Sequence, residues 1–246
     1  MNPSQNPDLK DVALIDSITT KSAAARQLLQ KIAQDFSPAT LANSLGAEDM
    51  VLTDLIMKDK LGIEIFSLDT GRLPVETYDL MQRLTRHYGL FLKMYYPRNE
   101  LVEEFVRSNG INGFYQSVDL RKACCHARKV EPLRRSLTGK KAWVTGLRAE
   151  QGETRSGLPQ QHFDEGNGLE KFNPLADWTE QEVWTYIRLH DVPYNRLHDK
   201  GYPSIGCAPC TRAIEPGEPL RAGRWWWESA DTKECGLHSI PVVVTA

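Results

Sequence analysis

The stretch Thr40-Leu41-Ala42-Asn43-Ser44-Leu45-Gly46-Ala47-Glu48-Asp49, which runs into residues 50–58, decides the predicted fold. Its first six residues are a short strand candidate, and the apolar spacing after Asp49 predicts a helix. Such a junction suits phosphate, because the first N–H groups of a helix lack partners. The loop lacks the Lys-Ser/Thr ending of a P-loop, and its two carboxylates would repel phosphate unless they turn away. A plain strand-to-helix connection is therefore the competing interpretation.

Strand candidates alternate with helix candidates along the chain. The apolar patterns predict strands at residues 62–68, 90–96 and 141–147, and helices at residues 23–36, 74–87 and 99–108. This alternation predicts an α/β fold with a doubly wound, mostly parallel sheet. Ligands of such sheets bind at the carboxyl ends of the strands. The loops at 44–49, 69–72 and 148–155 all lie at such ends, so we expect them to form one pocket.

The remaining segments are less regular. Residues 1–18 are polar and are expected to be loosely held, and residues 151–168 are expected to form a loop. Thr179 and Glu182 have the spacing of a capping box that opens another helix. From the length we predict a single α/β domain over residues 1–214, followed by a C-terminal tail over residues 215–246.

Composition and charge narrow the function classes. The 246 residues are 41% hydrophobic and 25% charged, with a formal net charge of −2, so there is no basic footprint for nucleic acid. The start of the chain lacks the basic and apolar regions of a secretory signal, and no run approaches the ~18 apolar residues of a membrane span. We therefore expect a cytoplasmic protein that binds neither nucleic acid nor a membrane.

The five cysteines divide into four and one. Cys124 and Cys125 are adjacent, Cys207-Ala208-Pro209-Cys210 follows downstream, and Cys235 stands alone near the C-terminus. In a reducing compartment, paired cysteines more often bind metal or do redox chemistry than form structural disulfides. Four thiolates suit a tetrahedral zinc ion or an iron–sulfur cluster. Two unrelated buried pairs are the alternative.

The tandem arrangement favours an iron–sulfur cluster over zinc, whose sites usually pair two Cys-x-x-Cys motifs. Adjacent side chains on a helix point about 100° apart, so one site that uses both Cys124 and Cys125 needs a distorted helix or a helix end. Lys122, Arg128 and Lys129 surround the pair, and Lys129 lies four residues after Cys125. A solvated basic face is the other interpretation of these charges.

Cys235 is the candidate nucleophile. A thiolate is the attacking form, and His238 and Lys233 could lower the pKa of this thiol. Arg221 and Arg224 lie upstream and could clamp an anionic group at the point of attack. Inert packing is the alternative for this cysteine. The run Trp225-Trp226-Trp227 fits a core, a base-stacking wall or a partner surface equally well.

Together these residues closely resemble the assimilatory adenylylsulfate and phosphoadenylylsulfate reductases over about residues 40–240. The matching stretches are 44–49, 68–72, 122–125, 146–148, 154–156, 171–175 and 234–238. The family branch that uses 5′-adenylylsulfate carries the four-cysteine set, and the branch restricted to the 3′-phosphorylated substrate lacks it. Leu45 and Glu48 depart from the Ser-Gly-Gly-x-Asp-Ser loop of the related ATP pyrophosphatases, which argues against ATP cleavage.

The resemblance implies a fold of the adenine-nucleotide alpha-hydrolase-like (PAPS reductase) type and thiol-dependent reduction of adenosine 5′-phosphosulfate (APS) to sulfite and AMP. It assigns a [4Fe–4S] cluster to Cys124, Cys125, Cys207 and Cys210, and an S-sulfocysteine intermediate to Cys235. The implied contacts to the adenosine nucleotide are Ser44, Leu45, Gly46, Ala47, Glu48, Asp49, Leu68, Asp69, Thr70, Gly71 and Arg72. The implied contacts around the phosphosulfate are Lys129, Arg148, Arg155, Arg221, Arg224 and His238.

The resemblance also implies partners. Only one cysteine is left free, so an external dithiol, thioredoxin or a glutaredoxin-like protein, must release the sulfite. Its attack requires the tail to leave the pocket, so we expect residues 215–246 to be mobile or lid-like. The family further implies a homo-oligomer, either dimer or tetramer. The alternatives are a reductase that prefers 3′-phosphoadenylyl sulfate and a non-catalytic iron–sulfur redox sensor that binds nucleotide.

Overall fold

Six strands form one sheet at the centre of the protein. The computed structural model describes residues 7, 9–151, 157–229, 233 and 237. The strand order is β3-β2-β1-β4-β6-β5, and every neighbouring pair is parallel except β5 with β6. The strands are β1 (Ala39–Ala42), β2 (Ile63–Leu68), β3 (Lys93–Tyr95), β4 (Ala142–Val144), β5 (Gln161–Asp164) and β6 (Leu169–Phe172). The predicted doubly wound, mostly parallel α/β fold is confirmed.

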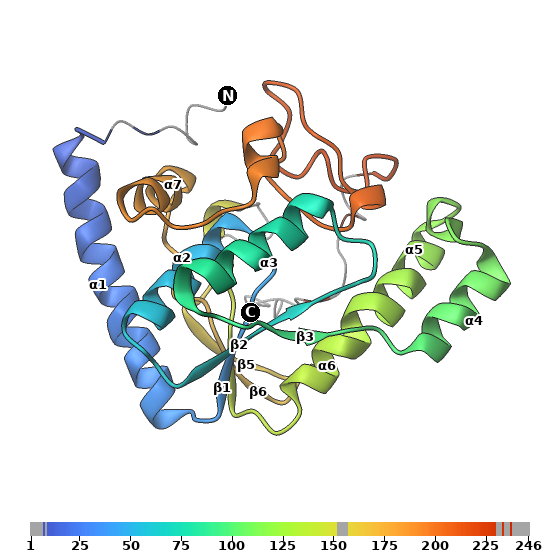
Figure 1. Cartoon of the computed structure of the whole chain (residues 1–246), viewed down its shortest axis with the longest axis horizontal. Coiled ribbons are helices and arrows are strands. Elements are labelled where there is room, and N and C mark those ends of the chain that lie inside the picture. The colour runs from blue at the N-terminus through green and yellow to red at the C-terminus, as the bar shows by residue number, and fades with distance from the viewer. Residues whose placement is uncertain (1–6, 8, 152–156, 230–232, 234–236, 238–246) are drawn as a thin grey trace, which may run out of the picture.

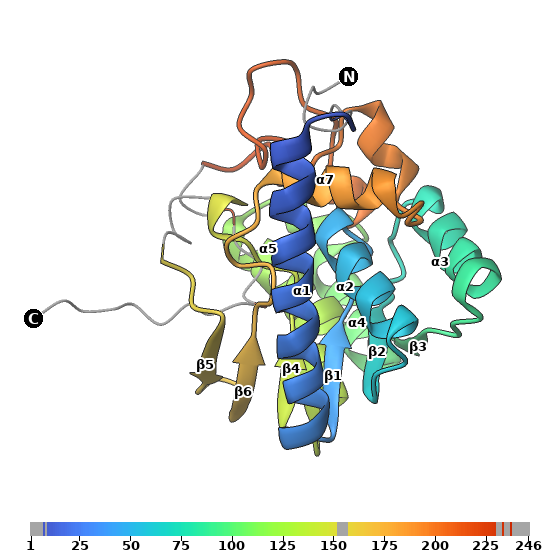
Figure 2. The ribbon, with the colours of Figure 1, turned by 90° about the vertical axis from the view of Figure 1, so that its left-hand side faces the viewer.

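Helices cover both faces of this sheet (Figures 1 and 2). α1, α2 and α7 pack against one another on one face, and α6 packs on β2 and β3. α4 and α5 contact each other beside α6. The helices are α1 (Val12–Asp35), α2 (Ala47–Lys58), α3 (Val75–Tyr88), α4 (Asn99–Asn109), α5 (Val118–Cys125), α6 (Glu131–Leu137) and α7 (Glu180–Leu189).

The main core lies between the sheet and the α1–α2–α7 layer. Leu41 of β1, Leu29 of α1 and Leu52 of α2 are each fully buried there. A smaller core on the opposite face joins Phe66 and Trp143 to α6. Parallel strands that are buried on both faces are expected to be continuously apolar, and β1 and β4 are buried along almost their whole length.

Two predictions about the irregular segments were wrong. The N-terminal helix begins at Val12 rather than near residue 23, because Asp11 accepts a hydrogen bond from the Leu14 N–H and Ile18 is buried in the main core. Residues 161–164 form β5 rather than a loop, because they pair with β6 at the sheet edge. A short, half-exposed edge strand has too little apolar periodicity for its sequence to reveal it.

The segment after α7 lies over the carboxyl ends of the strands (Figure 2). The capping box of α7 is confirmed, since Thr179 accepts from the Glu182 N–H and Glu182 accepts from the Thr179 N–H. Residues 191–229 are all described, and their regular structure is limited to 3₁₀ turns and a single bridge between Thr211 and Arg224. Within the described residues, no helix has both the length and the apolar character needed to cross a membrane.

Candidate active site

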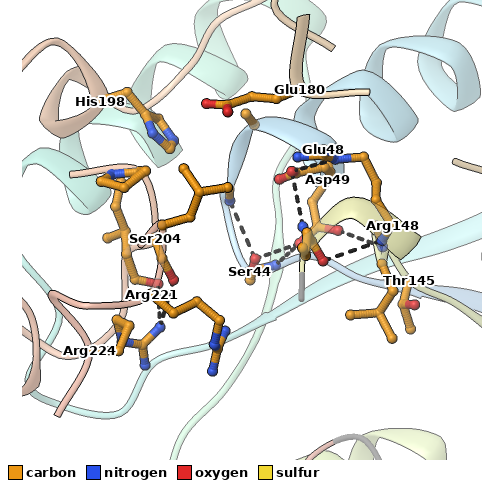
Figure 3. A pocket seen from close by; sticks show the side chains of 18 of the residues that line it. Ser44, Glu48, Asp49, Thr145, Arg148, Glu180, His198, Ser204, Arg221 and Arg224 are labelled. Carbon is orange, nitrogen blue, oxygen red and sulfur yellow. Dashed lines mark hydrogen bonds and ion pairs between the residues drawn. The ribbon is translucent and has the colours of Figure 1, made fainter. Parts of the chain in front are cut away.

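A pocket opens where the carboxyl ends of β1 and β4 meet the first turn of α2 (Figure 3). Its walls come from four segments that are far apart in the sequence. They are the β1–α2 loop with Ser44 and Glu48, the loop after β4 with Gly146 and Arg148, the 3₁₀ turn with His198, and the segment with Arg221 and Arg224. The β1–α2 loop and the start of the 148–155 loop therefore line one pocket, as predicted. Residues 152–156 of the second loop lie outside the described residues.

The β1–α2 loop is held rigidly by its own polar groups. The Asp49 carboxylate accepts hydrogen bonds from the Ser44 N–H at 2.7 Å and from the Gly146 N–H at 3.0 Å. A Cβ on Gly146 would lie 2.4 Å from an Asp49 oxygen, so only glycine allows β4 to approach α2 this closely. Burial raises the pKa of Asp49 to about 6, although the hydrogen bonds from Ser44 and Gly146 oppose this rise.

Both carboxylates of the loop are engaged by protein groups. Glu48 accepts from Arg148 Nε at 2.9 Å and from the Gln151 amide at 3.0 Å. Burial opposes ionisation of Glu48, but the Arg148 guanidinium, the backbone and the Gln151 amide together outweigh it and hold the pKa of this carboxyl below its usual range. Arg148 also donates to Glu150 and to the Trp178 carbonyl, so its charge is already shared within the protein. The anionic character of the loop is thus partly neutralised.

Besides Arg148, three cations line the pocket. Lys129, Arg221 and Arg224 all face it. Arg224 donates to Ser204 Oγ at 3.3 Å and packs over Trp225, with its Cζ 4.7 Å from the ring centroid. A Cβ on Gly206 would lie 2.3 Å from an Arg224 nitrogen, so this glycine makes room for the guanidinium. These cations suit an anionic ligand group.

An apolar pocket adjoins the polar one. Phe66, Leu68 and Trp143 contribute to its wall, and Leu237 reaches it from the C-terminal tail. Ser44, Lys129 and Ile205 line both pockets. A flat aromatic group in the apolar pocket and an anionic group near the cations could therefore belong to one ligand, as in a nucleotide.

The four predicted metal ligands surround one cavity. Cys124, Cys125, Cys207 and Cys210 are all buried and line it together with four cationic side chains, Arg72, Arg121, Arg128 and Lys129. Burial, with Cys207 nearby, raises the pKa of the Cys210 thiol to about 12, so an unligated Cys210 would stay protonated. Within the described residues, no His, Cys, Asp and Glu side chains form a group that could hold a metal ion.

The helix distortion predicted at the tandem cysteines is present. α5 ends at Cys125, and residues 126–130 form one π-helical turn before α6 begins. Such turns are rare and occur mostly at functional sites. The turn carries Arg128 and Lys129, and both line the cysteine cavity.

Direct contacts join the cysteine cavity to the polar and apolar pockets. Thr70 Oγ1 lies 3.2 Å from Cys207 Sγ, and Arg128 donates to the Thr70 carbonyl at 2.7 Å. Trp225 lies between the Arg121 and Arg224 guanidinium groups, each 4.7 Å from the ring centroid. Arg121 is in turn paired with Glu228 at 2.7 Å, and the Arg121 side chain is fully buried.

The predicted residues of the turn after β2 divide between the two sites. Leu68 and Thr70 line the apolar pocket. Arg72 lies in the wall of the cysteine cavity and donates to the Ile111 carbonyl. Asp69 accepts from the Tyr78 hydroxyl and the Gly71 N–H, away from the pocket lining. Three predicted residues, Arg155, Cys235 and His238, lie outside the described residues.

Several lining residues were not identified from the sequence. His198 and Trp184 line the polar pocket, and Arg121 lines the cysteine cavity. The sequence signal for Arg121 was available, since it precedes Cys125 by one helical turn. His198 lies on a short 3₁₀ turn outside the predicted helices and strands, and no local sequence pattern identifies it as a pocket residue. The sequence left open whether the run Trp225-Trp226-Trp227 forms a core, a stacking wall or a partner surface. In the structure Trp225 is buried, whereas Trp226 is 40% exposed.

Comparison with known proteins identifies clear relatives. Residues 38–213 match the family model described as a phosphoadenosine phosphosulfate reductase domain. The chain is 57% identical over 223 residues to adenosine 5′-phosphosulfate reductase of Allochromatium vinosum, covering 91% of this chain and 87% of that protein. It is 52% identical over 226 residues to the enzyme of the same name from Burkholderia cepacia, covering 92% and 90% of the two chains.

Solved structures agree with this relationship. The crystal structure of phosphoadenylyl-sulfate reductase from Candida auris, a phosphate complex, superposes with a TM-score of 0.67 at 29% identity, covering 81% of this chain and 97% of that one. FMN adenylyltransferase from Candida glabrata superposes with a TM-score of 0.57 at 15% identity, covering 88% of this chain and 75% of that one, which reflects a shared fold alone.

Proposed function

The chain belongs to the phosphoadenosine phosphosulfate reductase family, and from this premise we propose that it reduces adenosine 5′-phosphosulfate to sulfite and AMP in sulfate assimilation. The observation that carries this proposal is identity of 57% and 52%, over nine-tenths of the chain, to relatives named adenosine 5′-phosphosulfate reductase. The paired pockets, one apolar and one lined by Lys129, Arg221 and Arg224, support a nucleotide with an anionic end.

We assign the first chemical step to Cys235. Its thiolate attacks the sulfur of APS, an S–S bond forms, and the bond between that sulfur and the bridging oxygen breaks. AMP leaves with the electron pair of that oxygen, and the enzyme retains an S-sulfocysteine. Lys129, Arg221 and Arg224 neutralise the negative charge that develops on the bridging oxygen and phosphate. The four buried cysteines are committed to their own cavity, so Cys235 is the thiol left for this attack.

We further propose that Cys124, Cys125, Cys207 and Cys210 hold a [4Fe–4S] cluster, because the four thiols line one cavity, although the described residues include no group spaced to hold a single metal ion. Four cationic side chains line the cavity, as an anionic cluster requires, and the buried Trp225 Nε1–H in the adjoining core has no hydrogen-bond partner among the described residues. When bound, the cluster would supply a fixed negative charge beside Lys129, which also lines the substrate pockets. That charge would attract the Lys129 ammonium and so position it between the cysteine cavity and the substrate pockets. No electron transfer is needed for the attack.

Release of sulfite requires an external dithiol. One thiolate of thioredoxin, or of a glutaredoxin-like protein, attacks Cys235 Sγ and expels sulfite, and its second thiol then resolves the mixed disulfide. The dithiol supplies both electrons and becomes a disulfide. This exchange requires the part of the tail that carries Cys235 to withdraw from the pocket, whereas Arg224, Trp225 and Glu228 of the same tail are buried. It also requires a reducing compartment, so we place the enzyme in the cytoplasm. We also retain the prediction of a homo-oligomer, which sedimentation of the purified protein tests.

The test is intact-mass analysis of anaerobically purified, iron-loaded protein after addition of APS without a dithiol. We expect the mass of one sulfite adduct, loss of that adduct in Cys235→Ser, and release of sulfite when thioredoxin is added. An unchanged mass in the wild-type protein, with no sulfite after reduction, would refute the proposal. A matched Cys207→Ser variant separates the roles, because it should lose iron whereas Cys235→Ser should retain it.

The same preparation distinguishes the alternatives. A reductase that prefers the 3′-phosphorylated substrate would show the higher kcat/KM with 3′-phosphoadenylyl sulfate. A redox sensor would bind AMP and show cluster absorbance but release no sulfite. A colourless protein with stoichiometric zinc would exclude the cluster.

A further inference from the structure

His198 is a buried polar side chain that the reaction above does not use. It lies on the 3₁₀ turn Arg196–Lys200 and is 3% exposed. Neither ring nitrogen makes a hydrogen bond of normal geometry to the described residues. The Tyr202 backbone is close enough to favour protonation of the ring. A buried ring nitrogen that lacks a good hydrogen bond destabilises the folded protein, so such a group usually contacts a ligand or water.

The His198 ring points into the polar pocket. It belongs to the pocket lining, and Figure 3 shows it directed from its turn toward the space enclosed by the other labelled side chains. The Trp184 ring contacts it edge-to-face, with centroids 5.0 Å apart and an interplanar angle of 78°. This contact restricts the imidazole plane before a ligand binds.

His198 is an uncharged group in this pocket. Burial lowers its pKa to about 4, while Glu48, Asp199 and the Tyr202 backbone favour protonation less strongly. The neutral imidazole donates from one nitrogen and accepts at the other. It therefore suits a hydroxyl group, which can both donate and accept.

The surrounding charges indicate which part of a nucleotide reaches His198. Glu180 lines the same pocket, and Glu48 and Asp199 are the carboxylates whose charge acts on the His198 ring. Carboxylates disfavour an anionic phosphosulfate, which fits the arginines instead. The adenine ring fits the apolar pocket lined by Phe66 and Trp143. The ribose, with its neutral hydroxyls, is the part left for His198.

We propose that His198 is a substrate-positioning residue whose neutral imidazole hydrogen-bonds a ribose hydroxyl of the bound nucleotide. This inference rests on the proposed function, because it assumes that an adenosine nucleotide occupies the two joined pockets. It assigns to His198 a contribution to nucleotide affinity and none to the bond-breaking step. KM for APS should therefore depend on His198 far more than kcat does.

The test is calorimetric binding of AMP, 2′-deoxy-AMP and 3′-deoxy-AMP to the iron-loaded protein. His198→Phe keeps the ring and its contact with Trp184 but removes both hydrogen-bonding nitrogens. We expect AMP to bind about 3- to 10-fold more weakly to His198→Phe, and one deoxynucleotide to bind wild type and variant equally. His162→Phe is the matched control, since His162 also has two ring nitrogens without hydrogen bonds of normal geometry but lies on edge strand β5, outside the pocket lining. It should leave all three affinities unchanged.

The outcomes separate this inference from the proposed function. Equal loss of affinity for all three nucleotides, or unchanged AMP affinity, would overturn the role of His198 even if the wild type releases sulfite. Selective loss of one hydroxyl contact supports it even if no sulfite is released, in which case only the proposed reaction is refuted.

If His198→Phe does not fold, His198→Asn and His198→Ala replace it. The asparagine keeps a donor and an acceptor, so the His198→Asn variant should bind AMP more weakly than wild type and more tightly than the His198→Ala variant. Affinities that do not follow this order contradict the inference.

Discussion

At the scale of single residues, the site depends on which charges are already paired. Glu48 is paired with Arg148, and Asp49 is held by the Ser44 and Gly146 N–H groups. The loop that is suited to phosphate by its place before α2 therefore carries carboxylates that serve the protein itself. Besides Arg148, the cations that line the pocket are Lys129, Arg221 and Arg224. These residues are the ones whose substitution should alter substrate binding directly.

Substitution of Arg224 should weaken substrate use strongly. Arg224→Gln removes a buried cation from the pocket, and a hydrogen bond to a charged group contributes about 1.5–3 kcal/mol. We expect kcat/KM for APS to fall about 10- to 150-fold, measured as sulfite release. Arg107→Gln is the control, because the Arg107 side chain is 77% exposed on α4. An Arg224→Gln enzyme with wild-type kcat/KM would contradict the placement of the phosphosulfate.

His198 should make the protein sensitive to acid. Its pKa is about 4 in the folded protein against an ordinary value of 6.5, because burial disfavours the charged form. A lowered folded-state pKa gives stability that is fully present above pH 6.5 and is lost as the pH falls toward 4. Between about pH 7.5 and about pH 5 the free energy of unfolding of wild type should fall by about 2 kcal/mol more than that of His198→Phe. Equal losses in the two proteins, measured by urea titration, would exclude a buried neutral His198.

At the scale of elements, α5 and the first part of the C-terminal tail form one unit. The buried pair between Arg121 of α5 and Glu228 joins them, and Trp225 packs between Arg121 and Arg224. The π-helical turn after α5 continues this unit and places Lys129 between the cysteine cavity and the substrate pockets. The geometry of the arginine pair is therefore coupled to the helix that carries the tandem cysteines.

Breaking the buried ion pair from one side should destabilise the protein more than removing both partners. Arg121→Met leaves the Glu228 carboxylate buried without its cation, which typically costs about 3–5 kcal/mol. Arg121→Met combined with Glu228→Met removes the uncompensated charge and should recover part of that loss. Chemical denaturation of the single and double variants measures the coupling. A double variant that is as unstable as the sum of the single variants would show that the pair is not coupled.

At the scale of the whole molecule, the protein contains separate hydrophobic cores. One joins the sheet to α1, α2 and α7, and another groups the four cysteines with Phe105, Phe114 and Trp225. Because these groups of residues do not overlap, the sheet does not depend on the cysteine cavity for its own packing. Metal loading and folding of the sheet should therefore be separable.

Removal of iron should unfold the cysteine region locally and leave the sheet intact. We expect loss of colour and of sulfite release, retention of most far-ultraviolet circular dichroism, and protease cleavage first within residues 99–130 and 207–228. Cys235→Ser is the control, since it should lose turnover but keep both its iron and its resistance to protease. Complete loss of circular dichroism on iron removal would show instead that the two cores form one cooperative unit.

The sequence by itself determined the features of the fold and of the candidate site that depend on local patterns of residues. The strand–loop–helix pattern from Thr40 to Lys58 predicted the parallel sheet, and the four-plus-one division of the cysteines, with the motifs around it, predicted the family. The need for a distorted helix at Cys124 and Cys125 followed from helix geometry alone, and the π-helical turn confirms it. These conclusions rest on periodicity, on the spacing of neighbouring residues and on short motifs that can be read one by one along the chain.

The tertiary structure alone decided which side chains face the pockets. Arg148 and Glu48 are 100 residues apart, so no local pattern could show that they pair. The same holds for Arg121 with Glu228, 107 residues apart, and for Thr70 with Cys207, 137 residues apart. β5 exists only because β6 pairs with it, and His198 reaches the pocket through an irregular segment. Such contacts depend on where the chain folds back, because burial and pairing are properties of the packed molecule rather than of a stretch of residues.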